Sequence, residues 1–159
     1  MEKLRQAFRG EDKLIIIDRK EYFIFYSCTY KYPLLTVEYI NKNTGETIGE
    51  RFTRKDVKNP WRPDMGIPKE CRLYVKHYRK YMEYGGSNGH NAPADYHKTN
   101  LNTYLSTFKL SNHCPQEVVF NAGLWVLLEK WCKNLKNESN LENIMVYTGS
   151  IPSKKNIVF

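Results

Sequence analysis

The stretch GGSNGHNAPADY, at residues 85–96, contains the side chain best suited to acid–base chemistry. His90 follows five small or turn-forming residues and precedes an Ala-Pro pair. An imidazole with a pKa of about 6.5 can accept a proton at neutral pH. A histidine buried in a core needs no glycine-rich approach, so we expect flexible backbone that presents His90 to a substrate.

A helical pattern follows between residues 116 and 137. Its apolar residues recur mostly at spacings of three and four: Val118, Val119, Leu124, Leu127, Leu128, Trp131 and Leu135. Asn121 and Glu129 interrupt this pattern and are separated by roughly 12 Å along the axis. One of them could bind a metal while the other holds a metal-bound water, and an amide oxygen with waters suits Mg²⁺. The residues alone equally allow an ordinary Asn in the first helical turn and a solvated Glu.

The charge of the chain favours a polyanionic partner. Its 159 residues carry a formal net charge of +8, with a pI of about 9.3. Such an excess is typical of proteins that bind nucleic acid. Every arginine lies between Arg5 and Arg79, so arginine contacts to phosphate must come from the first half of the chain.

Short apolar and β-branched runs predict the sheet that must position these residues. Residues 14–17, 22–27 and 34–40 are expected as strands, 48–53 as a returning strand, and 144–150 as a later strand. Residues 71–83 have helical character, whereas residues 98–110 fit a strand or a loop. We expect Trp61, Trp125 and Trp131 in the core. This order predicts an α+β fold, with an antiparallel sheet interrupted by one long helix.

The cysteines show no spacing typical of a zinc ribbon or a redox motif. Cys28, Cys71, Cys114 and Cys132 are far apart, so we expect free thiols and favour a reducing compartment. The N-terminus shows no apolar signal region, and no apolar run is long enough to span a bilayer. A membrane is therefore not expected as a partner.

Four segments in order resemble the DNA/RNA non-specific endonuclease family, which includes mitochondrial endonuclease G and secreted bacterial nucleases. They are GGSNGHNAPAD, FKLSNHCPQ, FNAGLWVLLEKW and VYTGSIP, and WRPDMGIPKECR resembles the loop before the histidine motif. The similarity spans roughly residues 22–152. It implies a ββα-metal (His-Me finger) active-site motif within the α+β fold.

The resemblance also implies roles for individual residues. His90 matches the general base, Asn121 the single protein ligand of a catalytic Mg²⁺, and Glu129 the acidic residue that holds metal-bound water. Mn²⁺ could replace Mg²⁺. The implied activity is metal-dependent hydrolysis of phosphodiester bonds in DNA, RNA or both, without sequence specificity.

The chain departs from the family beside the histidine. Ser87 and Asn88 stand where the family has Asp-Arg, so a cation near the scissile phosphate is missing. Arg62 or Arg72 could supply phosphate contacts instead. The alternative function is a nuclease homologue with reduced or no catalysis, acting as a nucleic-acid-binding or structural subunit.

We expect residues 1–159 to form a single nuclease-like domain, in which residues 1–13 are a flexible segment. We expect the C-terminal part of the family fold to be absent from this sequence. An antiparallel sheet that stops early leaves an unpaired edge. We therefore expect a homodimer, or a partner chain that completes the sheet. The resemblance allows a mitochondrial or viral origin and leaves the compartment open.

Overall fold

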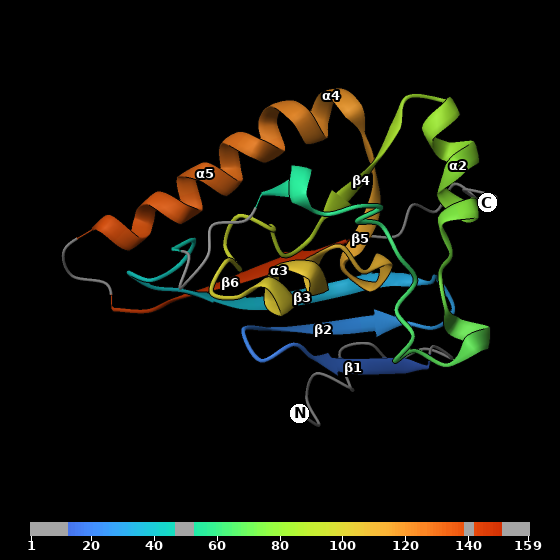
Figure 1. Cartoon of the computed structure of the whole chain (residues 1–159), viewed down its shortest axis with the longest axis horizontal. Coiled ribbons are helices and arrows are strands. Elements are labelled where there is room, and N and C mark those ends of the chain that lie inside the picture. Colours follow the sequence, from blue (N-terminus) through green and yellow to red (C-terminus); the bar gives the residue numbers. More distant parts are fainter. Residues whose placement is uncertain (1–12, 47–52, 139–141, 151–159) are drawn as a thin grey trace.

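A four-stranded antiparallel sheet organises the fold (Figure 1). The structure is a computed structural model that describes residues 13–46, 53–138 and 142–150. The sheet has the order β1 (Leu14–Asp18), β2 (Tyr22–Ser27), β3 (Tyr32–Ile40) and β6 (Ile144–Gly149). These strands confirm the predicted meander and the predicted late strand. The strand expected at 48–53 and the segment expected to be flexible at 1–13 fall almost wholly outside the described residues.

One face of β2 carries the main core. Tyr22, Ile24 and Tyr26 are fully buried and, as alternate residues of a strand, point to the same side of the sheet. They pack against Ile67 and Ala92, which come from the loops before and after the His90 strand. The main sheet thus supports these two loops through packing contacts.

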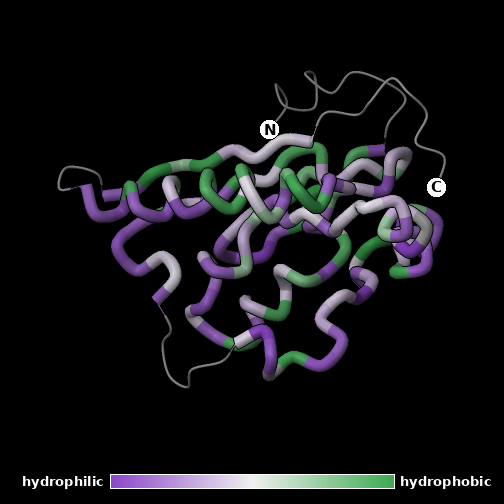
Figure 2. The backbone as a smooth tube through the Cα atoms, turned by 90° about the horizontal axis from the view of Figure 1, so that it is seen from above, coloured by the Kyte–Doolittle hydropathy of each residue, from purple (hydrophilic) through white to green (hydrophobic). Residues whose placement is uncertain are grey.

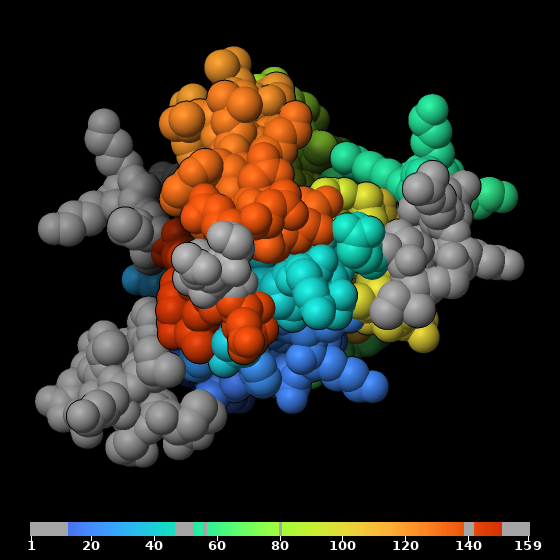
Figure 3. All heavy atoms as spheres, turned by 90° about the vertical axis from the view of Figure 1, so that its left-hand side faces the viewer, coloured from blue at the N-terminus to red at the C-terminus, as the bar shows by residue number. Residues whose placement is uncertain are grey.

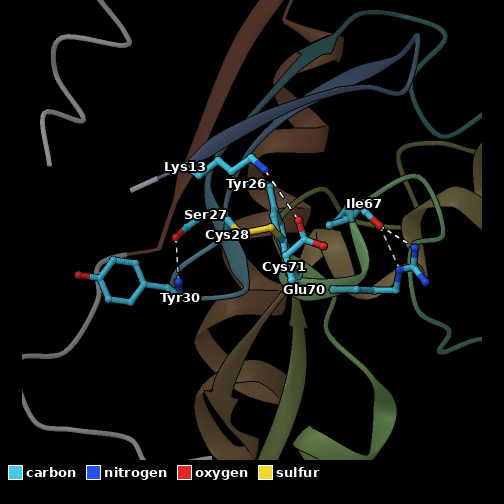
Figure 4. The surroundings of a disulfide bond; sticks show 9 residues. Lys13, Tyr26, Ser27, Cys28, Tyr30, Ile67, Glu70 and Cys71 are labelled. Atoms are coloured by element: carbon cyan, nitrogen blue, oxygen red, sulfur yellow. Dashed lines mark hydrogen bonds and ion pairs between the residues drawn. A yellow bond between two sulfur atoms is a disulfide. The ribbon is translucent and has the colours of Figure 1, made fainter. Parts of the chain in front are cut away.

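A disulfide joins the end of β2 to the loop region, which corrects the expectation that all thiols are free. Cys28 is bonded to Cys71, which lies 43 positions later in the sequence, whereas Cys114 and Cys132 are free (Figure 4). Cys71 belongs to the short helix η2 (Lys69–Cys71), and Tyr26 donates a hydrogen bond of 3.0 Å to its carbonyl oxygen. Only the fold brings these cysteines together, so their spacing gave no signal. The preference for a reducing compartment loses its basis.

A second, two-stranded sheet carries His90. It pairs β4 (Gly86–His90) with β5 (His113–Glu117), and helix α2 (Val75–Glu83) leads into it. The expectation of flexible backbone before His90 is therefore wrong: Gly86 and Gly89 belong to a paired strand, and Gly85, with a φ of 79°, forms the turn before it.

Helix α3 (Leu101–Thr107) replaces the strand or loop expected within residues 98–110. Asn100 caps it, because its side chain accepts a hydrogen bond of 2.9 Å from the Thr103 backbone N–H. Tyr104 and Phe108, four residues apart, pack together with Val57. The β-branched threonines obscured this helical spacing in the sequence.

The predicted long helix is confirmed, but it is divided. It comprises α4 (Val118–Phe120), the π-helical segment η4 (Asn121–Trp125), α5 (Val126–Asn134) and a final turn η5 (Leu135–Asn137). Seen from above in Figure 2, apolar residues recur along its coil. Trp131, expected in the core, is 59% exposed, because this side of the helix faces away from the sheets.

Candidate active site

The pairing of β4 with β5 sets the position of His90. His90 lies opposite His113, Gly89 opposite Cys114, and Ser87 opposite Gln116. A Cβ atom on Gly89 would lie 2.1 Å from the Gln116 side chain, so only glycine leaves room for that side chain to cross the strand. Gly86 and Gly89 therefore serve close packing, whereas Gly85 has open space and a left-handed φ of 79° that suits a turn.

Buried asparagine contacts hold the chain just after His90. Asn112 accepts a hydrogen bond of 3.0 Å from the Ala92 N–H through Oδ1, and it donates one of 2.9 Å to the Ala92 carbonyl through Nδ2. The Asn91 N–H donates to the Asn112 carbonyl at 2.9 Å. With backbone fixed on both sides, His90 has little freedom to move.

Aromatic rings surround the His90 imidazole. Its ring centroid lies 4.3 Å from that of His113, 5.3 Å from that of Trp61 and 5.4 Å from that of Phe108. Burial, assisted by the neighbouring His113 and Arg54, holds the pKa of His90 well below 6.5. His90 is therefore neutral at neutral pH. Its Nε2 atom is buried and has no hydrogen-bond partner among the described residues.

The π-helical segment brings the long helix into contact with the His90 strand. A π turn contains an extra residue, so residues four apart stay closely in line. Asn121 and Trp125 accordingly point to the same side. Asn121 Nδ2 donates to Ser87 Oγ at 3.0 Å, and Trp125 Nε1 donates to the His90 carbonyl at 3.2 Å. The side of the helix that carries Asn121 therefore faces the strand that carries His90. Both residues were predicted from the sequence.

Glu129 follows one turn further along the same side. Its backbone carbonyl accepts a hydrogen bond from the Tyr96 hydroxyl, which ties the helix to the segment after His90. Partial burial, with a smaller effect from the charge of Glu38, raises the pKa of the Glu129 carboxyl to about 7. This carboxyl is therefore divided between its two protonation states near neutral pH.

A buried charge network anchors the segment after His90 to the main sheet. His97 Nδ1 lies 3.1 Å from Glu21 Oε2, and His97 Nε2 lies 2.8 Å from Glu38 Oε2. Burial acts to lower the pKa of His97, but the hydrogen bonds to these carboxylates outweigh it and raise the pKa. A charged His97 can donate both N–H groups and join Glu38 of β3 and Glu21, just before β2, to this segment.

The cations predicted to bind phosphate lie in different environments. Arg62 is exposed. The Arg72 guanidinium donates to the backbone carbonyls of Ile67, at 2.7 Å, and Met65, at 3.2 Å, so it braces its own loop.

Sequence reasoning missed Arg54. This exposed residue of η1 (Arg54–Asp56) places its guanidinium 5.1 Å from the centroid of the Trp61 ring. Trp61 in turn contacts His90. The sequence offered no signal beyond a basic residue ahead of the WRPD loop, because the stacking depends on tertiary structure.

The site thus combines a neutral histidine, an oriented amide, a carboxyl with a raised pKa and nearby arginines. No group of three or more His, Cys, Asp or Glu side chains within the described ranges is arranged to hold a metal ion. Any metal would therefore depend mainly on the Asn121 amide oxygen and water. Nor does any helix in that part of the chain have the length and apolarity to cross a bilayer.

This arrangement agrees with the family that the sequence matches. The family model described as DNA/RNA non-specific endonuclease matches residues 3–158, and the chain belongs to that family. The resemblance inferred from the ordered motifs is therefore confirmed.

Its curated relatives include mitochondrial nucleases. The chain is 32% identical over 126 residues to "Nuclease EXOG, mitochondrial" of Danio rerio, covering 79% of this chain and 34% of that protein. It is 29% identical over 140 residues to "Nuclease 1, mitochondrial" of Schizosaccharomyces pombe, covering 87% of this chain and 38% of that protein. The chain thus spans about a third of the length of these relatives.

A solved structure supports the fold. The crystal structure of the EndoG/EndoGI complex matches with a TM-score of 0.74 at 24% identity, covering 94% of this chain and 58% of the other. The α+β class with antiparallel sheets, and its likeness to an EndoG-type nuclease fold, are therefore confirmed.

Proposed function

We propose that this protein is a Mg²⁺-dependent endonuclease that hydrolyses phosphodiester bonds of DNA, RNA or both without reading base sequence. One observation carries the proposal: the long helix contacts the His90 strand at both Ser87 and the His90 carbonyl, through Asn121 and Trp125. A base and a metal-binding oxygen are then on one side of the helix. Membership of the DNA/RNA non-specific endonuclease family supports the same reaction.

His90 acts as the general base. Its low pKa keeps the imidazole neutral, so it can take a proton from the attacking water. The surrounding rings of Trp61, Phe108 and His113 hold the imidazole in one orientation. An unpartnered Nε2 leaves capacity for a hydrogen bond with substrate or water.

Asn121 would hold the metal, and its contacts fit that role. Because Nδ2 donates to Ser87, the amide is oriented and Oδ1 is left as the acceptor. One neutral oxygen with several waters is a coordination that Mg²⁺ accepts, and Mn²⁺ has similar preferences. When bound, the metal would stabilise charge on the phosphate and on the leaving oxygen. Ser87 stands at the position of the family's Asp, and in this proposal it orients the amide of Asn121.

In its ionised form, Glu129 would accept hydrogen bonds from water held by the metal. Its raised pKa limits that form to pH values near or above 7. Tyr96 fixes the backbone of Glu129 relative to the segment after His90.

Arg54 supplies the cation that Asn88 cannot. Its position over Trp61, next to His90, suits contact with a phosphate in the site. Arg62 adds an exposed charge in the same loop region. Phosphate contacts of this kind bind nucleic acid without reading sequence, so DNA and RNA are both plausible substrates.

The Ser87-Asn88 pair favours a second reading, in which catalysis is reduced or lost and the protein binds nucleic acid as a subunit. Asn88 is buried, and its Oδ1 has no partner among the described residues. A neutral, buried side chain cannot reach a phosphate as an arginine would. The mitochondrial relatives make the same organelle a candidate location under either reading.

One assay separates the two readings. Plasmid DNA and RNA are incubated with the purified chain in Mg²⁺ or in EDTA, and binding to the same DNA is measured in parallel. Cleavage that requires Mg²⁺ supports the endonuclease. Binding without cleavage in any divalent metal supports the second reading and contradicts the first.

A further inference from the structure

Two buried ring nitrogens at the candidate base have no hydrogen-bond partner among the described residues. One is Nε2 of His90, and the other is Nδ1 of His113. The two residues are directly paired in β4 and β5, and their ring centroids lie 4.3 Å apart. A buried polar atom without a partner is unfavourable, so two of them in adjacent rings call for a physical explanation.

The fold determines which nitrogen of His113 carries its proton. His113 is fully buried, and its Nε2 atom lies 2.8 Å from the Thr107 carbonyl oxygen. Burial lowers the pKa of His113 to about 4, against the opposing effect of the backbone of Thr107 and Asn88, so the ring is neutral at neutral pH. A carbonyl oxygen can only accept, so the single ring proton is on Nε2. The Nδ1 atom of His113 is therefore a buried acceptor.

The Thr107 carbonyl is a fixed anchor for this ring. Thr107 is the last residue of α3 and is fully buried. Its carbonyl oxygen also accepts a hydrogen bond of 3.0 Å from Asn112 Nδ2, and Asn112 is the residue that holds Ala92. Figure 3 shows yellow atoms of the α3 region beside the orange atoms of the long helix, in agreement with the hydrogen bond that joins the segment before α3 to that helix. The protonated nitrogen of His113 is thus held away from His90.

The two ring nitrogens of His90 differ in their surroundings. The residue as a whole is half-buried, and Nε2 is buried without a partner, whereas Nδ1 is not closed off in this way. A neutral imidazole has one donor and one acceptor nitrogen. If Nδ1 is the acceptor that faces an attacking water, Nε2 carries the proton and is a buried donor. This donor and the buried acceptor of His113 complement each other.

We propose that His113 is a positioning residue for the candidate base: its Nδ1 atom accepts a hydrogen bond from His90 Nε2–H, directly or through one water, and leaves His90 Nδ1 to take the proton. This inference rests on the proposed function, because it concerns the same base. When His90 Nδ1 takes a proton from the attacking water, both of its nitrogens are protonated and the ring is a cation. The bond from Nε2–H to the neutral His113 ring then becomes charge-assisted and stronger.

The other described groups around His90 cannot supply this acceptor. The Arg54 guanidinium and the Trp61 indole N–H can only donate, and Phe108 has neither a donor nor a lone pair. His97 acts on His90 only through its charge, because both of its ring nitrogens bind carboxylates. Among these neighbours, the acceptor on β5 is therefore the one that matches the buried donor.

Long-range ¹H–¹⁵N NMR of the ¹⁵N-labelled full chain tests the proposal, because it identifies the protonated nitrogen of each imidazole. The chain has only four histidines, so substitution can assign every ring. In the parent at neutral pH, both His90 and His113 should carry the proton on Nε2. This measurement needs no substrate, so it is independent of the proposed function, which fails if the parent does not cleave nucleic acid.

Two substitutions of nearly equal shape isolate the acceptor. His113→Asn keeps an acceptor at the position of Nδ1, whereas His113→Leu removes it, and both lose the bond to Thr107. His90 should remain protonated on Nε2 in His113→Asn and should populate both tautomers in His113→Leu. In cleavage assays, His113→Leu should lower kcat roughly 10–10²-fold with KM little changed, a part of what a general base contributes. His113→Asn should retain most of the kcat of the parent.

Melting curves verify the folding of each variant. His113→Phe keeps a ring without an acceptor and replaces His113→Leu if the smaller side chain unfolds the protein. A proton on Nδ1 of His90 in the parent would overturn the proposal. So would a folded His113→Leu or His113→Phe in which His90 keeps the tautomer of the parent. Equal kcat values for His113→Leu and His113→Asn would show that His113 acts through packing alone.

Discussion

At the scale of single residues, the proposed site would replace the cation that is missing at position 88 with one from a different element. Position 88 holds a buried asparagine, whereas Arg54 reaches the His90 cluster by stacking on Trp61. The chemistry needs positive charge near the phosphate, and the strand that carries His90 need not supply it.

We expect Arg54→Ala to lower kcat/KM for a short DNA duplex by roughly 10²-fold, the effect of removing one preorganised charge contact. Arg54→Lys, which keeps the charge but not the planar stack, should retain more activity. Arg79→Ala removes the same charge from the exposed side of α2 and should change the rate less than twofold. Equal rates for Arg54→Ala and Arg79→Ala would show that Arg54 does not contact substrate.

The pKa values of His90 and Glu129 predict which group sets the pH dependence. His90 stays neutral well below pH 6.5, so acidification to that value does not inactivate the base. The pKa of Glu129 is about 7, and in the proposed mechanism its carboxylate form is the stronger acceptor for hydrogen bonds from water at a bound metal. The Mg²⁺ concentration for half-maximal activity should therefore rise roughly tenfold between pH 8 and pH 6.

Glu129→Gln should flatten this dependence, while its activity at pH 8 falls. The measurement is a Mg²⁺ titration of cleavage at each pH, with melting curves to verify folding. If Glu129→Gln shows the same dependence as the parent, another group is responsible.

At the scale of elements, the sequence predicted the long helix and the strands of the main sheet, but it did not predict helix α3 or the strand that contains His90. Short apolar and β-branched runs predicted β1, β2, β3 and β6, and the spacing of Val118 to Leu135 predicted the long helix. Helix α3 was missed because its threonines favour strands locally, and its packing against Val57 is a tertiary contact. The strand containing His90 was missed because glycine is rare in strands.

The candidate site was predicted in part. His90 and Asn121 could be named because ordered motifs identify their types and positions. Arg54 could not, because its stacking on Trp61 joins residues from separate turns of the chain. The same reason applies to the exposed apolar residues of the long helix, such as Leu124, Leu127 and Trp131: spacing shows that a helix has an apolar face but not which way that face points.

Two glycines of different elements should respond oppositely to alanine. At Gly86 in β4, a Cβ atom would lie 2.1 Å from the Tyr81 ring, so Gly86→Ala should cost about 1–3 kcal/mol of stability. At Gly123 in the long helix the space is open, so Gly123→Ala should be neutral or stabilise by up to about 1 kcal/mol. Urea unfolding of both variants measures the difference. Similar values would contradict the packing described for β4.

At the scale of the whole molecule, the fold supports the His90 strand from several directions. The main sheet holds the segment after His90 through His97, and the long helix holds it through Tyr96. The disulfide fastens the preceding loop, which contributes Ile67 to the main core. Because these contacts come from several elements, the geometry of the site depends on the whole fold.

The disulfide should contribute substantially to stability. Closing a loop of 43 residues corresponds to about 4 kcal/mol in the chain-entropy account, and measured values are usually about 2–4 kcal/mol. Cys28→Ser with Cys71→Ser should therefore lower the free energy of unfolding by about that amount. The parent should show the same loss in reducing agent, whereas Cys132→Ser, which removes a free thiol, should not. An unchanged free energy in the double variant would mean that the bond adds nothing to stability.

The central claim is that His90 removes the proton from the attacking water in a metal-dependent cleavage. The most direct measurement is the rate at which His90→Ala cleaves plasmid DNA in saturating Mg²⁺, relative to the parent, with melting temperature and DNA affinity measured on the same samples. The account predicts a loss of roughly 10²–10⁴-fold, the usual contribution of a positioned general base, in a protein that folds and binds DNA like the parent. Cleavage by folded His90→Ala at the rate of the parent would contradict it.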